Sequence, residues 1–330
     1  MEGVELSIIF MNIFKNTNVL VTGGTGFVGA HLVEGLIKQK ANIVTTYISE
    51  NPKSYFRSKK LNQYTSTVNI DVCDYEKLFD IITKYKIEYI YHLAAQALVD
   101  VAYDNPKRTL YTNILGTINI CESARLYSKV KGVIIASSDK AYGKLSQAKY
   151  KETDPLAGDH PYEVSKSAAD LIANSYIQTY KVPIVITRFG NIYGQGDLNF
   201  SRIIPGIMEA LINHQTLLLR SNGKFVRDYL YVKDVVAGYL TLAEKIDISR
   251  GQAFNFGSNE TLTVLELINR IEKILHKKID FKIINTAHNE IPYQSLDYSK
   301  ISKLLGWKTK WNLKNTIKSI YKFYRQYYEM

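Results

Sequence analysis

The sequence predicts an α/β protein with a doubly wound parallel sheet and a smaller mixed α/β lobe in its C-terminal part. Three observations support this. Over the first 190 residues or so, short apolar runs alternate with helix-like segments. Those segments are about ten residues or longer, which favours parallel pairing of the strands. After Gly190 the alternation stops, which indicates that a second lobe begins there.

The elements of the first part follow from hydrophobic periodicity and from the breakers between the runs. We expect strands over residues 18–22, 42–47, 67–70, 88–93, 132–136 and 184–188. We expect helices over residues 27–39, 75–85, 106–127 and 162–180.

The second part has shorter and more mixed elements. A Gly-rich loop over residues 191–197 precedes a helix over 203–213. Strands are expected over 227–231 and 253–256, and helices over 235–242, 264–275 and 313–327. We therefore expect residues 1–190 to form the first domain, to which residues 229–257 return. Residues 191–228 and 258–330 would then form the smaller, substrate-binding lobe.

Composition excludes several classes of protein. A chain of 330 residues with 46% hydrophobic and 22% charged residues is typical of a globular protein that buries a full core. The net charge is +11, but the lysines are scattered and no nucleic-acid-binding motif accompanies them. We expect attraction to small anionic substrates and no binding of nucleic acid.

Neither a disulfide framework nor a metal site is expected, because Cys73 and Cys121 do not form a CxxC pair. No apolar run approaches the roughly 20 residues of a membrane span. The apolar run over residues 6–11 is too short for a signal peptide. We expect a cytoplasmic protein without membrane contact, whose translation starts at Met1 or Met11.

A glycine-rich loop joins the first strand to the first helix. It reads Gly23-Gly24-Thr25-Gly26-Phe27-Val28-Gly29 and fits both GxGxxG and GxxGxxG. Glycine permits a tight turn and close approach of the backbone to a pyrophosphate, and the helix N-terminus offers free N–H groups to the phosphates. The loop therefore predicts a dinucleotide site in a Rossmann-like domain, the alternative being a tight turn without a ligand.

The choice between NAD and NADP stays open at this point. An acidic residue at the end of the second strand would favour NAD, but Glu50 comes late in the chain for that role. Lys53 and Arg57 could pair with a 2′-phosphate. Asp71 ends the third strand, where a carboxylate either reaches the adenine amino group or caps a turn.

Tyr162 and Lys166 form a candidate catalytic pair. They are four residues apart and share one face of a helix. A tyrosine is a poor base near neutral pH, because its ordinary pKa is about 10, but a nearby ammonium favours the phenolate. Ser138 follows a strand and can hydrogen-bond the hydroxyl being oxidised. Asp139 and Lys140 add an acid and a base that plain alcohol oxidation does not need; the alternative is an ion pair at the strand end.

These motifs resemble an extended short-chain dehydrogenase/reductase, specifically a nucleotide-sugar 4,6-dehydratase. The resemblance covers residues 18–325. Its carriers are Thr22–Gly29, His92–Gln96, Thr112–Thr117, Ser137–Lys140, Tyr162–Lys166, Arg188–Gly194 and Arg227–Tyr229. Within the superfamily the chain is most similar to the CDP-glucose 4,6-dehydratase branch, through residues 94–99, 138–140, 154–162 and 296–300. It departs from that branch at Gly24, where the branch has His, and over residues 226–232, so the nucleotide base stays open.

The resemblance implies a reaction and a set of roles. Tyr162 takes the proton from O4 while C4 gives hydride to the cofactor. Lys140 removes the C5 proton, Asp139 protonates the leaving C6 hydroxyl, and the hydride returns to C6. The product is a 4-keto-6-deoxy sugar, and Ser138 and Lys166 assist the oxidation.

The resemblance also assigns the binding residues. The cofactor, NAD in preference to NADP, contacts Gly23, Gly24, Thr25, Gly26, Phe27, Val28, Gly29, Asp71, Val72, Leu93, Ala94, Ala95, Tyr162 and Lys166. The nucleotide-sugar substrate contacts Gln96, Asn191 through its backbone N–H, and Arg227. Arg202 is a second candidate for the diphosphate because a planar guanidinium suits phosphate oxygens, the alternative being a solvated helix start. The helices over 106–127 and 162–180 resemble those of a dimeric four-helix interface, which implies a homodimer.

Two other functions stay open. A 4-epimerase or reductase would use Ser138, Tyr162 and Lys166 without Asp139 and Lys140. A cofactor-binding scaffold protein would use none of them for turnover, which the intact Tyr162/Lys166 pair disfavours.

Overall fold

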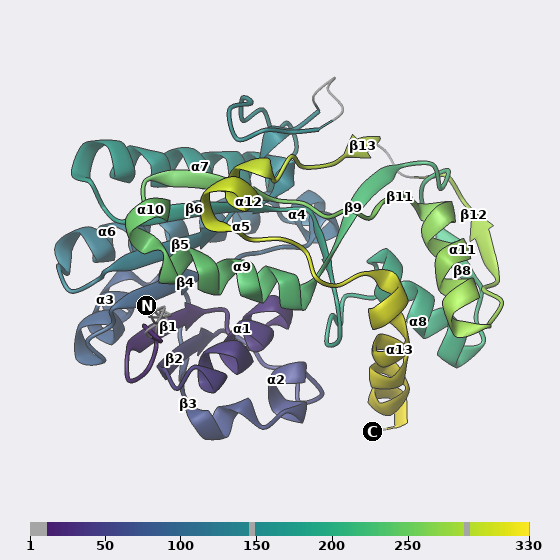
Figure 1. Cartoon of the computed structure of the whole chain (residues 1–330), viewed down its shortest axis with the longest axis horizontal. Helices are drawn as coiled ribbons and strands as arrows, with labels where there is room; N and C mark the ends of the chain where they lie inside the picture. Colours follow the sequence, from purple (N-terminus) through teal and green to yellow (C-terminus); the bar gives the residue numbers. More distant parts are fainter. Residues whose placement is uncertain (1–11, 145–148, 287–290, 330) are drawn as a thin grey trace, which may run out of the picture.

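The computed structural model describes residues 12–144, 149–286 and 291–329. A seven-stranded sheet dominates one side of the molecule (Figure 1). Its spatial order is β10-β6-β5-β4-β1-β2-β3, and every neighbouring pair is parallel. The strands are β1 (Asn18–Thr22), β2 (Asn42–Tyr47), β3 (Thr65–Asn69), β4 (Tyr89–His92), β5 (Gly132–Ala136), β6 (Ile184–Phe189) and β10 (Gln252–Phe256). This sheet confirms the predicted doubly wound fold.

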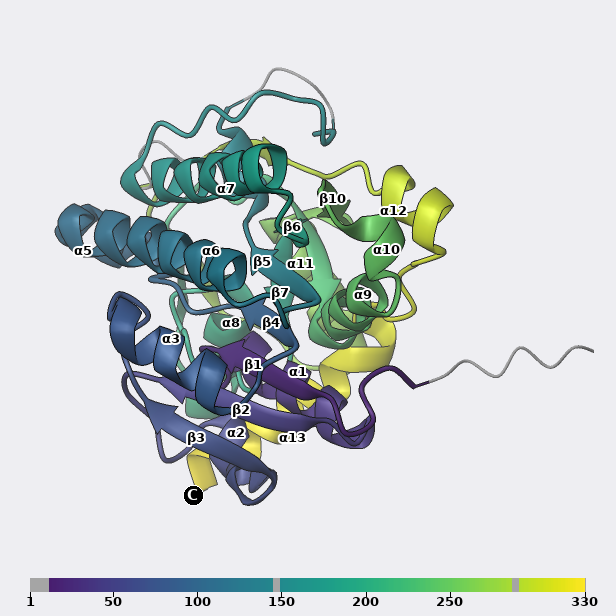
Figure 2. The ribbon, with the colours of Figure 1, turned by 90° about the vertical axis from the view of Figure 1, so that its left-hand side faces the viewer.

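Helices cover both faces of the sheet (Figure 2). One face carries α1 (Phe27–Lys38), α9 (Val232–Glu244), α10 (Ile246–Ser249) and α12 (Ser299–Leu305). The other carries α3 (Tyr75–Lys84), α5 (Pro106–Leu110), α6 (Gly116–Leu126) and α7 (Pro161–Tyr180). Side chains alternate along β1, so that Val19 and Val21 enter the hydrophobic core on one face of the sheet and Leu20 enters the core on the other face. Burial on both faces explains why these strands are continuous apolar runs.

Short helical turns occupy several connections of the large domain. They are α2 (Tyr55–Ser58), η1 (Leu61–Tyr64), α4 (Val99–Asp104), η2 (Tyr111–Leu115) and η3 (Asp139–Tyr142). The helix expected over 106–127 is present to Leu126, but it is not α-helical throughout, because η2 is a π-helical turn between α5 and α6. Asn113 lies in that turn, and its side chain bonds groups from two other segments. The π-helical turn thus coincides with the residue whose side chain is bonded to other segments of the chain.

The smaller lobe packs beside the carboxyl ends of the large-sheet strands (Figure 1). One small sheet consists of β7 (Asn191–Tyr193), β9 (Val226–Tyr231), β11 (Thr261–Thr263) and β13 (Tyr293–Gln294), and a second pairs β8 (Leu217–Leu219) with β12 (Phe281–Ile283). Its helices are α8 (Ile203–Asn213), α11 (Val264–Leu275) and α13 (Leu313–Glu329). Their apolar faces meet in a separate core that includes Ile207, Leu267, Ile271, Ile317 and Ile320.

The chain returns to the large domain twice. Residues 232–256 form α9, α10 and the edge strand β10. Residues 299–307 also lie there, although the expected boundaries group them with the smaller lobe. Trp307 packs edge-on against Phe256, and its indole N–H donates to the Asp234 carbonyl at 3.1 Å. Ile301 and Leu305 join the same core, and this apolar contact holds the segment on the large sheet.

Within the described ranges, no helix is both long enough and apolar enough to cross a membrane.

Candidate active site

A cavity of about 1620 Å³ lies between the two lobes, at the carboxyl ends of the large-sheet strands. This edge is where open parallel sheets place their ligands. All of the site residues predicted from the sequence line the cavity except Gly24, which lies behind the loop surface. The structure therefore brings the expected cofactor, catalytic and substrate residues to one place.

The glycine loop has the shape of a phosphate cradle. Gly23 has φ +68°, and a Cβ there would come within 3.0 Å of the Ala94 backbone. A Cβ on Gly29 would lie 2.3 Å from the Gly23 carbonyl oxygen. Helix α1 begins after Gly26 with no side-chain cap, so its first N–H groups are available to an anion. These residues fit the pyrophosphate of a dinucleotide.

Thr22, at the end of β1, holds the residues that follow β4 beside this loop. Its hydroxyl oxygen accepts hydrogen bonds from the N–H groups of Leu93 and Ala94, at 3.1 and 3.2 Å. It also lies 2.9 Å from Nδ1 of His92. Burial lowers the pKa of His92 to about 3, so this ring is neutral. Leu93 and Ala94 are thus held against Gly23, where both line the cavity.

The charged residues that follow β2 already have partners within the protein. Arg57 donates from Nε to Glu50 Oε2 at 3.0 Å, and a second contact joins the same two side chains. Lys53 lies over the ring of Tyr327, 5.5 Å from its centroid. Arg57 is thus already paired with a carboxylate. Asp71 lines the cavity and also caps its own turn, since its Oδ1 accepts from the Cys73 N–H at 2.9 Å.

Ser138, Tyr162 and Lys166 converge where β5 and α7 approach each other. Lys166 donates to the Ala136 carbonyl at 2.8 Å, and burial lowers its pKa to about 8. Burial raises the pKa of Tyr162 to about 12. The Arg202 guanidinium and a hydrogen bond with Ser138 oppose that rise, and the charge of Asp139 adds to it. The sequence predicts Lys166 as the cation that favours the phenolate, but in the structure the charge that lowers the pKa of Tyr162 is that of Arg202 from the other lobe, while Lys166 bonds Ala136.

Asp139 and Lys140 lie next to this trio in η3. The Asp139 side chain is 3% exposed, and its Oδ1 accepts from the Ser138 hydroxyl at 3.1 Å. Lys140 Nζ lies 3.5 Å from the same oxygen. The two residues therefore form the ion pair considered from the sequence, but they form it inside the cavity, within reach of Ser138.

The substrate side of the cavity is rich in donors. Arg202 donates to the buried Asp197 at 3.1 Å, and Arg227 donates to the Val226 carbonyl at 2.8 Å. In the described structure, Asn191 Nδ2 and the Tyr229 hydroxyl are buried without a hydrogen-bond partner. They stand on paired positions of β7 and β9. Unpaired buried donors favour a ligand rich in acceptors, such as a diphosphate.

The side-chain amide of Gln96 is occupied within its own loop. Its Nε2 donates to the Leu98 carbonyl at 2.9 Å and to Thr109 Oγ1 at 2.8 Å, while its Oε1 accepts from the Leu98 N–H at 2.6 Å. Gln96 lines the cavity, but a direct side-chain contact with substrate requires this loop to rearrange.

The profile of the GDP-mannose 4,6 dehydratase family matches residues 20–320. The chain belongs to this family. It is 30% identical to the CDP-glucose 4,6-dehydratase of Salmonella typhimurium over 332 residues, which covers 95% of this chain and 92% of that protein.

Solved structures of two kinds of enzyme share the fold. The dTDP-glucose 4,6-dehydratase of Bacillus anthracis, in complex with NAD, superposes with a TM-score of 0.84 at 25% identity, covering 95% of this chain and 98% of that one. The UDP-glucose 4-epimerase of Thermotoga maritima, with UDP-glucose, gives 0.85 at 28% identity, covering 94% and 99%. The fold therefore does not distinguish dehydration from epimerisation.

In this family member, sequence reasoning missed residues that organise the site. Asn113 is buried; its Oδ1 accepts from the Gln96 N–H at 2.8 Å, and its Nδ2 donates to Gln96 O and Ser165 Oγ. Glu163, next to Tyr162, has its pKa raised to about 7 by burial. The Thr112–Thr117 motif pointed to the Asn113 region, but no local pattern revealed the partners of either side chain.

Proposed function

We propose that the chain is an NAD-dependent nucleotide-sugar 4,6-dehydratase, with CDP-glucose as the first candidate substrate. The observation that carries this proposal is the presence of Asp139 and Lys140 beside Ser138, Tyr162 and Lys166 in one cavity. A 4-epimerase or reductase needs the last three residues only. Elimination of water needs an additional acid and base.

The oxidation step uses Tyr162 as the base for the sugar O4 proton. Ser138 hydrogen-bonds the same oxygen, and the positive charge of Arg202 favours the phenolate form of Tyr162. NAD, when bound, supplies the hydride acceptor for C4 and the hydride donor for C6. The C4 ketone makes the C5 proton acidic, which prepares the elimination.

The elimination step requires a neutral amine and a protonated carboxyl. Lys140 must be neutral to remove the C5 proton, and Asp139 must carry a proton for the departing C6 hydroxyl. The two side chains lie 3.5 Å apart in the cavity, so both can reach neighbouring carbons of one sugar ring.

Product analysis tests the proposal. Purified protein is incubated with NAD and separately with CDP-, dTDP-, GDP- and UDP-hexoses. A 4-keto-6-deoxy product, which absorbs in strong alkali, supports dehydration and identifies the nucleotide. A C4 epimer formed without loss of water would show the epimerase alternative, and no conversion would favour a scaffold protein.

Asp139→Asn separates the two halves of the reaction. The amide cannot protonate the C6 hydroxyl, so we expect elimination to fall by about 100-fold or more, the range typical of general acids. Exchange of the C5 hydrogen with solvent should survive, because Lys140 remains. Deuterium incorporation followed by NMR measures this exchange, and full dehydratase turnover by the variant would refute the assignment of the acid.

We further propose that the chain forms a homodimer through α6 and α7, which lie side by side on one face (Figure 2). Large apolar side chains stand exposed there, with Leu171 at 57%, Tyr180 at 56% and Leu126 at 51%. A second copy would cover this surface. Light scattering should give the mass of a dimer for the wild type and of a monomer for Leu171→Glu; a monomeric wild type contradicts the proposal.

A further inference from the structure

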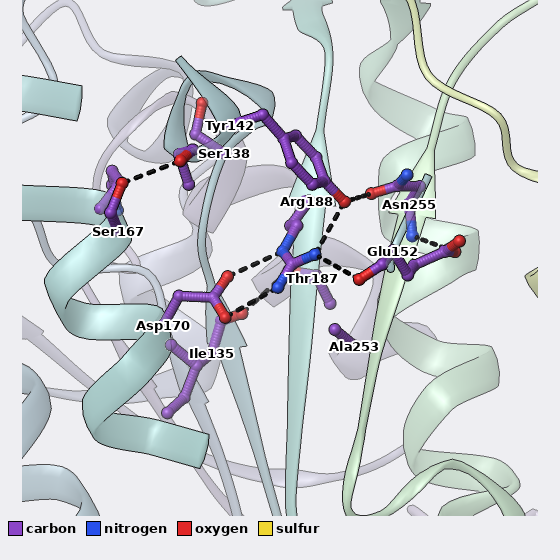
Figure 3. A network of polar contacts seen from close by, with 12 residues as sticks. Ile135, Ser138, Tyr142, Glu152, Ser167, Asp170, Thr187, Arg188, Ala253 and Asn255 are labelled. Atoms are coloured by element: carbon purple, nitrogen blue, oxygen red, sulfur yellow. Dashed lines mark hydrogen bonds and ion pairs between the residues drawn. The ribbon is translucent and has the colours of Figure 1, made fainter. Parts of the chain in front are cut away.

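Arg188 lies at the centre of a buried polar network behind the catalytic residues (Figure 3). It is 5% exposed and comes from β6. Its guanidinium forms a two-pronged ion pair with Asp170 of α7, at 2.8 and 2.9 Å. The third nitrogen, Nη1, donates to the Tyr142 hydroxyl at 2.7 Å and to the Glu152 carbonyl at 3.3 Å.

Tyr142 connects this network to the turn that carries the acid and base. It is the last residue of η3 (Asp139–Tyr142) and is fully buried. Its hydroxyl accepts from Arg188 and donates to Asn255 Oδ1 at 2.7 Å. The Arg188 guanidinium also lies 4.8 Å from the centre of the Tyr142 ring. Tyr142 is thus held by both a hydrogen bond and a cation–π contact.

Asn255 anchors the far side of the network on the edge strand β10. Its backbone N–H donates to Glu152 Oε1, and its Nδ2 donates to the Tyr150 carbonyl, both at 2.9 Å. Figure 3 shows Asp170, Tyr142, Glu152 and Asn255 surrounding the Arg188 side chain. Two strands distant in sequence, β6 and β10, therefore fix the position of the Tyr142 hydroxyl.

Asp170 connects the same network to the oxidation residues. It lies one helical turn after Lys166 on α7, and its charge acts on the Lys166 ammonium. A second link joins α7 to η3, since Ser167 Oγ donates to the Ala141 carbonyl at 2.8 Å. One guanidinium thus connects the helix of Tyr162 and Lys166 with the turn of Asp139 and Lys140.

We propose that Arg188 is a positioning residue that, through Tyr142, holds the Asp139–Lys140 turn in register with Tyr162 and Lys166. This inference rests on the proposed dehydratase function. Both half-reactions act on one sugar ring, so the acid and base must stay aligned with a substrate already placed for oxidation. Misplacement of catalytic groups by about 1 Å can cost about 100-fold in rate. A planar guanidinium suits the role, because its fork keeps Asp170 while the third nitrogen holds Tyr142.

Tyr142→Phe tests the inference with little risk to folding. The variant keeps the ring and the Arg188–Asp170 pair and removes only the hydroxyl. In single turnovers we expect C4 oxidation, measured by absorbance of the reduced nicotinamide, to stay within about twofold of the wild type. Elimination should fall about tenfold or more, so that reduced cofactor and the 4-keto hexose accumulate.

Tyr91→Phe is the matched control. It likewise removes a buried tyrosine hydroxyl, one that donates to the Tyr239 carbonyl at 3.4 Å, but Tyr91 lies in β4, outside η3 and the hydrogen bonds of Arg188. We expect it to leave both rates unchanged. Arg188→Lys should resemble Tyr142→Phe, because an ammonium cannot hold Asp170 and Tyr142 in the same geometry.

Either of two results for Tyr142→Phe would overturn the inference: equal losses in both half-reactions, or no loss in either. A Tyr91→Phe variant with the same selective loss would also do so. Failure of the proposed function is distinguishable, because the wild-type protein itself would then release no 4-keto-6-deoxy product from any nucleotide hexose.

Discussion

Gly24→Ala should destabilise the protein mainly through a collision with Thr45 of the neighbouring strand β2. A Cβ on Gly24 would lie 1.9 Å from Thr45 Oγ1, 2.9 Å from Thr45 Cβ and 3.2 Å from Val33 Cγ2. Thr45 is fully buried, and its hydroxyl donates to the Val21 carbonyl at 2.8 Å. To make room, Thr45 must abandon that hydrogen bond or the loop must move away from β2.

The magnitude follows from these two costs. Loss of the Thr45 hydrogen bond costs about 1 kcal/mol. Overpacking in a dense core costs a further 1–3 kcal/mol, roughly. We expect Gly24→Ala to lower the free energy of unfolding by about 2–4 kcal/mol, as measured by urea titration without cofactor. NADH affinity should fall as well, because the displaced loop carries the phosphate-facing residues Gly23 and Gly26.

Thr45→Ala provides the decisive control. It removes the colliding oxygen, so the double variant should be more stable than the sum of the single effects predicts, by about 1 kcal/mol or more. Thr45→Ser keeps the oxygen and should give no such rescue. Additive losses in Gly24→Ala/Thr45→Ala would refute the collision with Thr45 as the cause.

Two further predictions concern charge. Because the pKa of Lys166 falls to about 8 in the folded protein from an ordinary 10.5, the folded state binds fewer protons between those values, and stability should rise with pH there. The free energy of unfolding of the wild type should therefore rise relative to that of Lys166→Met between about pH 7 and about pH 9.5. A difference that stays constant over this range would contradict the lowered pKa. Glu50→Gln should release Arg57 and shift the NADP/NAD affinity ratio toward NADP by about tenfold, since one such charge-assisted contact contributes about 1.5 kcal/mol. Fluorescence titration with NADH and NADPH measures the ratio, and an unchanged ratio would show that Arg57 does not reach the ribose.

Local sequence patterns predicted much of the fold. The strands Asn18–Thr22, Asn42–Tyr47 and Gly132–Ala136 have the expected bounds, as have the helices Ile203–Asn213 and Val264–Leu275. Each is an apolar or amphipathic run with clear breakers at its ends. The π-helical turn at Tyr111–Leu115 was not predictable in this way, because the partners of Asn113 come from outside its own helix.

The site was predictable where its residues follow strand ends. Gly23, Ser138 and Leu93 each come shortly after a parallel strand, and such positions meet at one edge of the sheet. Contacts between segments that are distant in the sequence were not predictable. The effect of Arg202 on Tyr162 and the pairing of Arg188 with Asp170 depend on how distant segments pack.

The return of the chain to the large sheet constrains the order of folding. The strand β10 pairs with β6, but the chain builds much of the smaller lobe between them. During synthesis β6, buried along its whole length in the finished fold, must wait as an open sheet edge until residues 252–256 emerge. An exposed apolar edge invites pairing with other chains. A polypeptide ending at residue 190 would keep that edge open permanently and should aggregate.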